Sequence, residues 1–431
     1  MASEAVVAEP VGGCSIVPGG SLPGLAAAGW EDVAFVVLDG GRERLVGALA
    51  GDLGAGNPHA SLERSGILVV SPYRVDGNGL LLAGGSYSRV SLHVEADKPV
   101  VRKRLAVSES PSEDRELRQI QEIEWLTAAP AAVSELFAPI IATRHSETEL
   151  ELKLQFVPGY TLAELVFQRR LDGPGLAAAL AHVYSLVSST LWSRPPLTDA
   201  AARSAGYVQR IRRRIGDILA SDYPADGVLR SFLQARTVVV DGRRCVGPRR
   251  LLEILGEQRW DPVVNPAGST LCHGDLILED ILVSARAPHG FRLVDPNPAN
   301  GNPLFDLAKT MMSLWLGYEL IYFDLFAIAW RQGREAVEVE IELGAEEVQA
   351  VYRDAAERFV SFVEVELAHR LALPRNDLRS LLRMSAAIHM LAIVVFHLLH
   401  HGREQRALAF AATAMLHAQA ALDARAPGPR A

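Results

Sequence analysis

Three aspartates at the ends of two apolar runs have the residue type and spacing to do chemistry. Asp275 follows an apolar pair and His273-Gly274, and Asp280 comes five residues later. Asp295 ends a second apolar run. Two hairpin-like strands in this segment would bring the three carboxylates to one end of the pair. Carboxylates packed together repel one another unless cations join them, and hard oxygen ligands select Mg²⁺, which commonly also binds substrate phosphates. The segment therefore predicts a magnesium-dependent phosphate site.

A glycine-rich turn upstream suits a role in holding phosphates. Phosphoryl transfer needs a metal, a phosphate cradle, a lysine and a carboxylate that orients the attacking hydroxyl. Gly84, Gly85 and Ser86 lie between two strand-like runs. Because glycine lets the backbone approach a ligand closely, this turn is predicted to lie over the phosphates of a nucleotide.

A lysine in the middle of a later strand-like run is the predicted lysine of this phosphoryl-transfer site. Lys103 is placed to reach the α- and β-phosphates, and either Glu122 or Glu124 on the following helical stretch could pair with it. Gln155 and Val157, on either side of Phe156, match a hinge whose backbone would hydrogen-bond adenine. The ordered set predicts binding of ATP with Mg²⁺.

The elements that must position these residues follow from the hydrophobic pattern. Four strand-like runs come first, at 80–83, 90–94, 100–105 and 150–156. One helical stretch, 114–128, lies before the last of them. After Thr161 the pattern is mostly helical, apart from a β-rich patch between Thr270 and Asp295. Segregation of strands and helices predicts an α+β fold. The predicted parts are an N-terminal extension of unreadable role (1–75), a β-rich nucleotide-binding lobe (76–160) and a helical lobe (161–431).

The motifs HGDLxxxxIL, VDP and NPLFDLAK (302–309) resemble the aminoglycoside phosphotransferase and choline kinase superfamily. The similarity covers about residues 80 to 400 and is greatest to a branch associated with capsule and surface polysaccharides. In that branch a DG pair like Asp241-Gly242 precedes the HGD motif. The resemblance implies a protein-kinase-like, two-lobed fold and ATP-dependent phosphorylation of a hydroxyl on a small molecule, such as a sugar, polyol, amino alcohol or antibiotic.

The resemblance also implies a role for each matching residue. Asp275 would orient or deprotonate the acceptor hydroxyl, and Asp295 would bind Mg²⁺ between the β- and γ-phosphates. Lys103 would hold the α- and β-phosphates, with Glu122 as its helix partner. Asp306 would brace the catalytic loop.

Asp280 departs from the family pattern, which usually has Asn at this metal-binding position. Aspartate still offers an oxygen ligand to Mg²⁺ but adds a negative charge. A nucleotide-binding pseudokinase or scaffold is therefore an alternative. A kinase of peptide serine or threonine is another, although the short segment 296–305 favours small substrates.

Composition limits the classes of partner. The net charge of −8 argues against a nucleic-acid binder. A local basic run, Arg210 to Arg214, is interpreted as a solvated helix surface or an anion-binding patch.

Three widely spaced cysteines predict neither a disulfide framework nor a zinc site and fit a reducing cytoplasm. The start of the chain lacks the basic region of a signal peptide. The most apolar stretch, 386–399, is too short to span a bilayer and is predicted to be a core helix.

Overall fold

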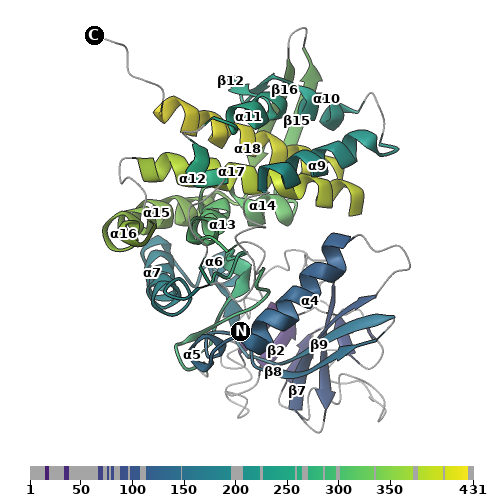
Figure 1. The fold of residues 1–431 in the computed structure, drawn as a ribbon, viewed down its shortest axis with the longest axis vertical. Coiled ribbons are helices and arrows are strands. Elements are labelled where there is room, and N and C mark those ends of the chain that lie inside the picture. Colours follow the sequence, from purple (N-terminus) through teal and green to yellow (C-terminus); the bar gives the residue numbers. More distant parts are fainter. Residues whose placement is uncertain are drawn as a thin grey trace, which may run out of the picture. The chain divides into compact units, whose positions relative to one another are not determined.

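The structure is a computed structural model (Figure 1). The structure describes residues 15–18, 34–37, 67–70, 75–76, 79–81, 88–95, 98–106, 113–146, 148–195, 207–223, 227–257, 260–264, 270–284, 287–297, 301–333, 336–371, 377–400 and 403–425.

The chain divides into two compact units. The first contains residues 1–170 and 279–296, and the second contains 171–278 and 297–431. The first is rich in strands and the second is largely helical, so the predicted α+β class is confirmed. The first unit extends to residue 170, beyond the predicted boundary at residue 160, and it also includes segment 279–296, which was assigned to the helical lobe.

The first unit is built on a six-stranded sheet with the order β4-β5-β6-β7-β9-β8. Its strands are β4 (Val75–Asp76), β5 (Gly79–Leu81), β6 (Arg89–Glu95), β7 (Lys98–Ala106), β8 (Ile140–His145) and β9 (Glu149–Gln155). Helix α4 (Glu113–Ala128) contacts β8 and β9. A separate three-stranded sheet, β1-β2-β3, comprises Ser15–Pro18, Ala34–Val37 and Ile67–Val70.

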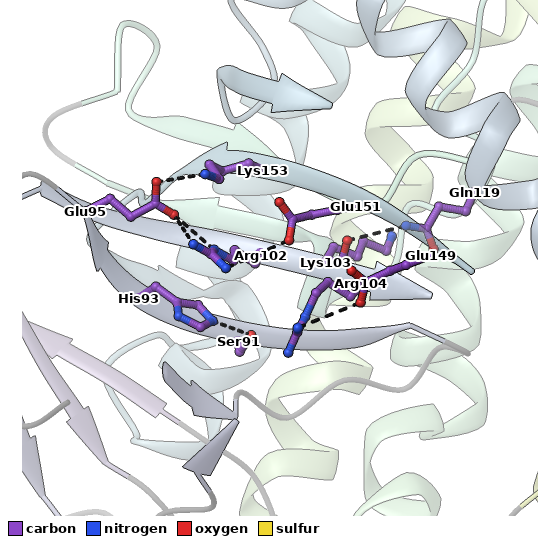
Figure 2. A network of polar contacts seen from close by, with 10 residues as sticks. All are labelled: Ser91, His93, Glu95, Arg102, Lys103, Arg104, Gln119, Glu149, Glu151 and Lys153. Atoms are coloured by element: carbon purple, nitrogen blue, oxygen red, sulfur yellow. Dashed lines mark hydrogen bonds and ion pairs between the residues drawn. The ribbon is translucent and has the colours of Figure 1, made fainter. Parts of the chain in front are cut away.

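The two faces of the six-stranded sheet differ in chemistry, because successive side chains of a strand point to opposite faces. Leu92 and Leu152 are fully buried on one face, where burial of a leucine stabilises the fold by roughly 1.5–3 kcal/mol. The other face carries a ladder of charges across β6, β7 and β9, shown in Figure 2. There Glu95 accepts hydrogen bonds from Arg102 and Lys153, each at 2.7 Å.

A small sheet explains why segment 279–296 belongs to the first unit. Strands β13 (Ile281–Val283) and β14 (Phe291–Leu293) form an antiparallel hairpin, and β13 also pairs with β10 (Tyr160–Thr161). The hairpin is further held by Leu293, whose N–H donates to Leu136 O at 2.7 Å. The described part of the unit also contains two short helices, α5 (Ala131–Ser134) and α6 (Leu162–Phe167).

The second unit consists mainly of helices. They are α7 (Gly173–Thr190), α9 (Tyr207–Ala220), α10 (Val228–Gln234), α11 (Pro248–Ile254), α12 (Asp261–Val264), α13 (Pro303–Leu316), α14 (Tyr318–Tyr322), α15 (Glu346–Phe362), α16 (Ala368–Leu371), α17 (Leu378–Val395) and α18 (Glu404–Ala424), with π-helical turns at Val363–Leu367 and Phe396–His400.

The apolar stretch near residue 390 is a core helix, as the sequence predicts. Among the described residues, Leu378–Leu398 alone is long and apolar enough to cross a membrane, but 78% of its apolar window is buried inside the protein. Helix α17 packs against α13 and α18. Such burial is typical of a core helix.

A four-stranded sheet in the second unit was not predicted. Its order is β12-β11-β16-β15, with strands at Arg243–Val246, Thr237–Val240, Val337–Leu343 and Phe326–Gln332. One face packs on α18. The alternation VEVEIEL over 337–343 has the period of a strand, so this sheet is an addition to a second unit that is mainly helical, as predicted.

Candidate active site

Lys103 links two elements of the first unit through its ammonium group. The nitrogen lies 2.7 Å from Glu122 Oε2 on α4 and 2.9 Å from Asp295 Oδ1, which follows β14. The side chains of Lys103 and Glu122 are only 6% and 3% exposed, whereas that of Asp295 is 35% exposed. Of the two glutamates considered as partners, the structure brings Glu122 to the lysine, and Glu124 is exposed.

Helix α4 is fixed to the sheet one turn before Glu122. The Gln119 amide donates to the main-chain oxygens of Lys103 and Leu150, both at 3.4 Å, and accepts from Ser88 at 2.8 Å. Figure 2 shows Gln119 reaching from α4 to the main chain of Lys103. Because residues three apart lie on the same face of a helix, Gln119 sets the position from which Glu122 meets the lysine.

The β13–β14 hairpin brings Asp280 and Asp295 to the same end of the strand pair. Asp280 directly precedes β13, and its carbonyl accepts from Val294 N–H at 3.1 Å. Asp295 has a φ of 55°, a left-handed conformation that costs a non-glycine residue on the order of 1–3 kcal/mol. Such strain is concentrated at functional sites and marks Asp295 as a candidate.

The donor chemistry of this hairpin end fits a magnesium ion. Asp280 and Asp295 offer carboxylate oxygens, and Mg²⁺ is commonly held by one or two carboxylates together with substrate phosphates. Within the described residues, no group of three or more His, Cys, Asp or Glu side chains is placed to hold a metal. Within the first unit the Asp295 carboxylate is paired with Lys103, and within the second unit the Asp275 carboxylate is paired with a different lysine.

Lys309 is the partner of Asp275 in the second unit, and its role was missed in the sequence. Its Nζ lies 2.7 Å from Asp275 Oδ1, and the two side chains are 10% and 17% exposed. The DLAK motif contains this lysine, so the signal was present in the sequence. The motif alone did not show which carboxylate the lysine contacts.

Asp306 braces the loop that carries Asp275. It is fully buried and accepts from the N–H groups of His273 (3.2 Å) and Gly274 (2.5 Å) and from Trp192 Nε1 (3.0 Å). Gly274 has a φ of 80°, which favours glycine at this turn. The bracing role implied for Asp306 agrees with this geometry.

One face of α13 therefore holds the whole loop. Asp306, Lys309 and Thr310 are spaced three and four apart, so they project from the same side of the helix. Asp306 binds the main chain at its start, Lys309 binds the Asp275 side chain, and Thr310 donates to Leu276 O at 2.8 Å. The buried His273 accepts from Asp275 N–H at 3.3 Å through Nδ1 and contributes to the same loop.

Asp306 should also make the stability of the protein depend on pH. Burial raises its pKa to about 7, although its three N–H donors favour the ionised form. Between about pH 4 and 7 the native state keeps a proton that the unfolded chain has released, so the free energy of unfolding falls as pH rises, by up to about 1.4 kcal/mol per pH unit. Between pH 5.5 and 7.5, the free energy of unfolding of the Asp306→Asn variant should therefore fall by about 1–2 kcal/mol less than that of the unmodified protein, as measured by urea unfolding.

Glu319 provides a matched comparison for that experiment. Its pKa is also raised to about 7 by burial, and it is bonded to Ser313 rather than to the loop. Glu319→Gln should therefore remove a similar pH slope without touching Asp275. If both variants keep the slope of the unmodified protein, the carboxylates are ionised throughout and the prediction is wrong.

The structure describes only some of the other residues that were predicted to contact the nucleotide. Gly84, Gly85 and Ser86 lie outside the described residues. Gln155 ends β9, and its N–H already donates to Pro139 O at 2.8 Å, so this donor is taken. Val157 lies between β9 and β10, where a hinge was predicted.

Comparisons with known proteins give distant similarities. No protein-family model matches the chain, and no curated protein matches it. A solved structure of aminoglycoside-3'-phosphotransferase of type VIII aligns with 19% identity over 70% of this chain and 91% of its own, with a TM-score of 0.35. A microcompartment-associated aminopropanol kinase aligns with 13% identity over 81% of this chain and 94% of its own, also with a TM-score of 0.35.

Proposed function

We propose that this protein transfers the γ-phosphoryl group of ATP, with Mg²⁺, to a hydroxyl group of a small molecule. The observation that carries the proposal is the buried Lys103 ammonium, which joins Glu122 of α4 to Asp295 of the hairpin. Kinase chemistry requires a lysine held by a helix glutamate and an aspartate that binds the metal. Lys103, Glu122 and Asp295 belong to three different elements of the chain. Their contact therefore does not arise simply because they are neighbours in the sequence.

In the proposed reaction, the acceptor oxygen attacks the γ-phosphorus while the bond from that phosphorus to the β,γ-bridging oxygen breaks. The hydroxyl proton passes to the Asp275 carboxylate, and ADP is the leaving group. Lys103 binds the α- and β-phosphates, and Asp280 and Asp295 are the residues that would hold Mg²⁺. The metal, when bound, neutralises charge on the β- and γ-phosphates.

Lys309 has a defined part in this proposal. An ammonium group 2.7 Å from Asp275 favours the ionised form of the carboxylate, which is the form that accepts a proton. The same contact fixes one oxygen of Asp275 and so orients the carboxylate. Lys309 is therefore proposed as a positioning residue.

The acceptor is proposed to be a sugar, polyol, amino alcohol or antibiotic, and the reaction is proposed to take place in the cytoplasm. The two described cysteines, Cys245 and Cys272, are buried and free, which is compatible with a reducing compartment. Binding of nucleotide without turnover is a second candidate, favoured by the extra negative charge of Asp280 beside Asp295.

Nucleotide binding is the first test. ATP with Mg²⁺ should raise the melting temperature, because a ligand at 100 times its Kd stabilises the native state by about 2.7 kcal/mol. The shift should shrink when EDTA replaces Mg²⁺. No shift at millimolar ATP would count decisively against the proposal.

Turnover separates the two candidates. Release of ADP should depend on an added acceptor from a panel of sugars, polyols, amino alcohols and aminoglycosides. Binding without ADP release across the panel, at every Mg²⁺ concentration, would favour the non-catalytic candidate. In that case Asp280→Asn is the variant to assay for restored turnover.

A further inference from the structure

A pocket of about 540 Å³ lies among α9, α10 and α11 in the second unit, and the proposed reaction makes no use of it. Its volume lies within the range of roughly 300–1,000 Å³ that is typical of small-molecule sites. The lining residues are Arg212, Ile215, Leu219, Leu233, Gln234, Arg249, Leu252 and Glu253.

One side of the pocket is cationic and has hydrogen-bonding capacity to spare. Arg212 donates to Leu252 O at 2.8 Å and to Gln209 Oε1 at 3.1 Å. A guanidinium group carries five N–H donors, so these two contacts orient the side chain and leave three donors without a partner in the described chain. The exposed Arg249 guanidinium makes no hydrogen bond or ion pair with the described residues.

The acidic residue of the pocket does not offset these charges. Glu253 is bound by Arg236 through both carboxylate oxygens, at 2.6 and 2.8 Å, and by Arg250 at 2.9 Å. These arginines lower the pKa of Glu253, which therefore stays ionised with its charge already balanced. Arg212 and Arg249 remain as net positive charges.

The other side of the pocket is apolar. Ile215 and Leu233 are buried, while Leu219 and Leu252 are half-buried and keep apolar surface toward solvent. Arg212, Ile215 and Leu219 are spaced three and four apart on one face of α9, so a cation and an apolar strip occur side by side.

We infer that this pocket binds an organic anion: a carboxylate, sulfonate or phosphate group carried on a short hydrocarbon body. Arg212 and Arg249 bind the anionic group, since arginine matches the planar oxygen pairs of such groups. The leucines and Ile215 bury the hydrocarbon. Of the two interpretations of the Arg210–Arg214 run, the anion-binding patch thus applies to Arg212, whereas Arg214 donates to Ala392 O at 2.9 Å.

Calorimetric titration of the full chain with octanoate tests this inference, with octylamine as the cationic control. Octanoate should bind, and Arg212→Gln or Arg249→Gln should each weaken binding about tenfold or more, as expected for one charge-assisted contact. Removal of each CH₂ from octanoate should weaken binding about fourfold. Arg353→Gln, at an exposed arginine of α15, should bind octanoate like the unmodified protein.

Three results would overturn the inference. They are no octanoate binding at millimolar concentration, equal binding of octylamine, or equal weakening by Arg353→Gln. The titration contains no nucleotide, so its failure would leave the proposed phosphotransfer untouched.

Discussion

Asp275→Asn should abolish phosphoryl transfer and leave ATP binding intact. The asparagine keeps the shape of the side chain but cannot take the proton of the acceptor hydroxyl. Removal of a group that orients and deprotonates a nucleophile lowers turnover by about 10²–10⁴-fold. ADP release with an acceptor measures the loss, and the ATP-induced shift in melting temperature measures binding.

The Asp275→Asn substitution also affects Lys309, because it leaves the poorly exposed Lys309 ammonium without its carboxylate partner. The double variant Asp275→Asn/Lys309→Met removes both charges. It should regain stability lost by the single variant but no activity. Recovery of activity together with stability would show that Asp275 acts only through folding.

Asp295→Asn is the matched comparison. Asp295 belongs to the proposed nucleotide and metal site, so this variant should lose the Mg²⁺-dependent part of ATP binding, whereas Asp275→Asn should not. If both variants lose ATP binding to the same extent, the division of roles between the two aspartates is wrong.

The central strands and the helix of the six-stranded sheet could be predicted from the sequence. Strands 90–94, 100–105 and 150–156 and helix 114–128 were visible because alternation and helical periodicity are local signals. The choice between Glu122 and Glu124 was also within reach. Glu122 lies three residues after Gln119 and four before Leu126, all buried, so helical periodicity puts it on the inner face.

Long-range contacts could not be predicted in the same way. The pairing of Lys309 with Asp275 depends on how α13 packs beside the loop, which no local pattern encodes. The left-handed conformation of Asp295 runs against its sequence context, because a residue before proline favours extended backbone. Tertiary contacts, among them the ion pair with Lys103, override that preference.

Lys103→Met should strongly lower both the stability of the protein and its binding of nucleotide. The lysine ammonium is nearly inaccessible and stands between Glu122 and Asp295. Removal of one partner of a buried ion pair costs about 3–5 kcal/mol, because the remaining charge loses its compensation. ATP should no longer raise the melting temperature, since the group that binds the α- and β-phosphates is absent.

Lys153→Met is the matched control on the same sheet. Lys153 pairs with Glu95 at 2.7 Å, the same distance as in the Lys103–Glu122 pair, but on the charged face of the sheet (Figure 2). Its side chain is 16% exposed and that of Glu95 is 32% exposed, so water replaces much of the lost interaction. This variant should lose no more than about 1 kcal/mol and should keep the ATP response.

A third variant separates folding from function at Lys103. Lys103→Met/Glu122→Met replaces the buried pair by apolar side chains of similar volume, a change that is often neutral for stability. The double variant should melt near the temperature of the unmodified protein and still fail to respond to ATP, because stability is restored without the phosphate-binding cation. A normal ATP response in this variant would show that Lys103 holds α4 to the sheet and has no part in nucleotide binding.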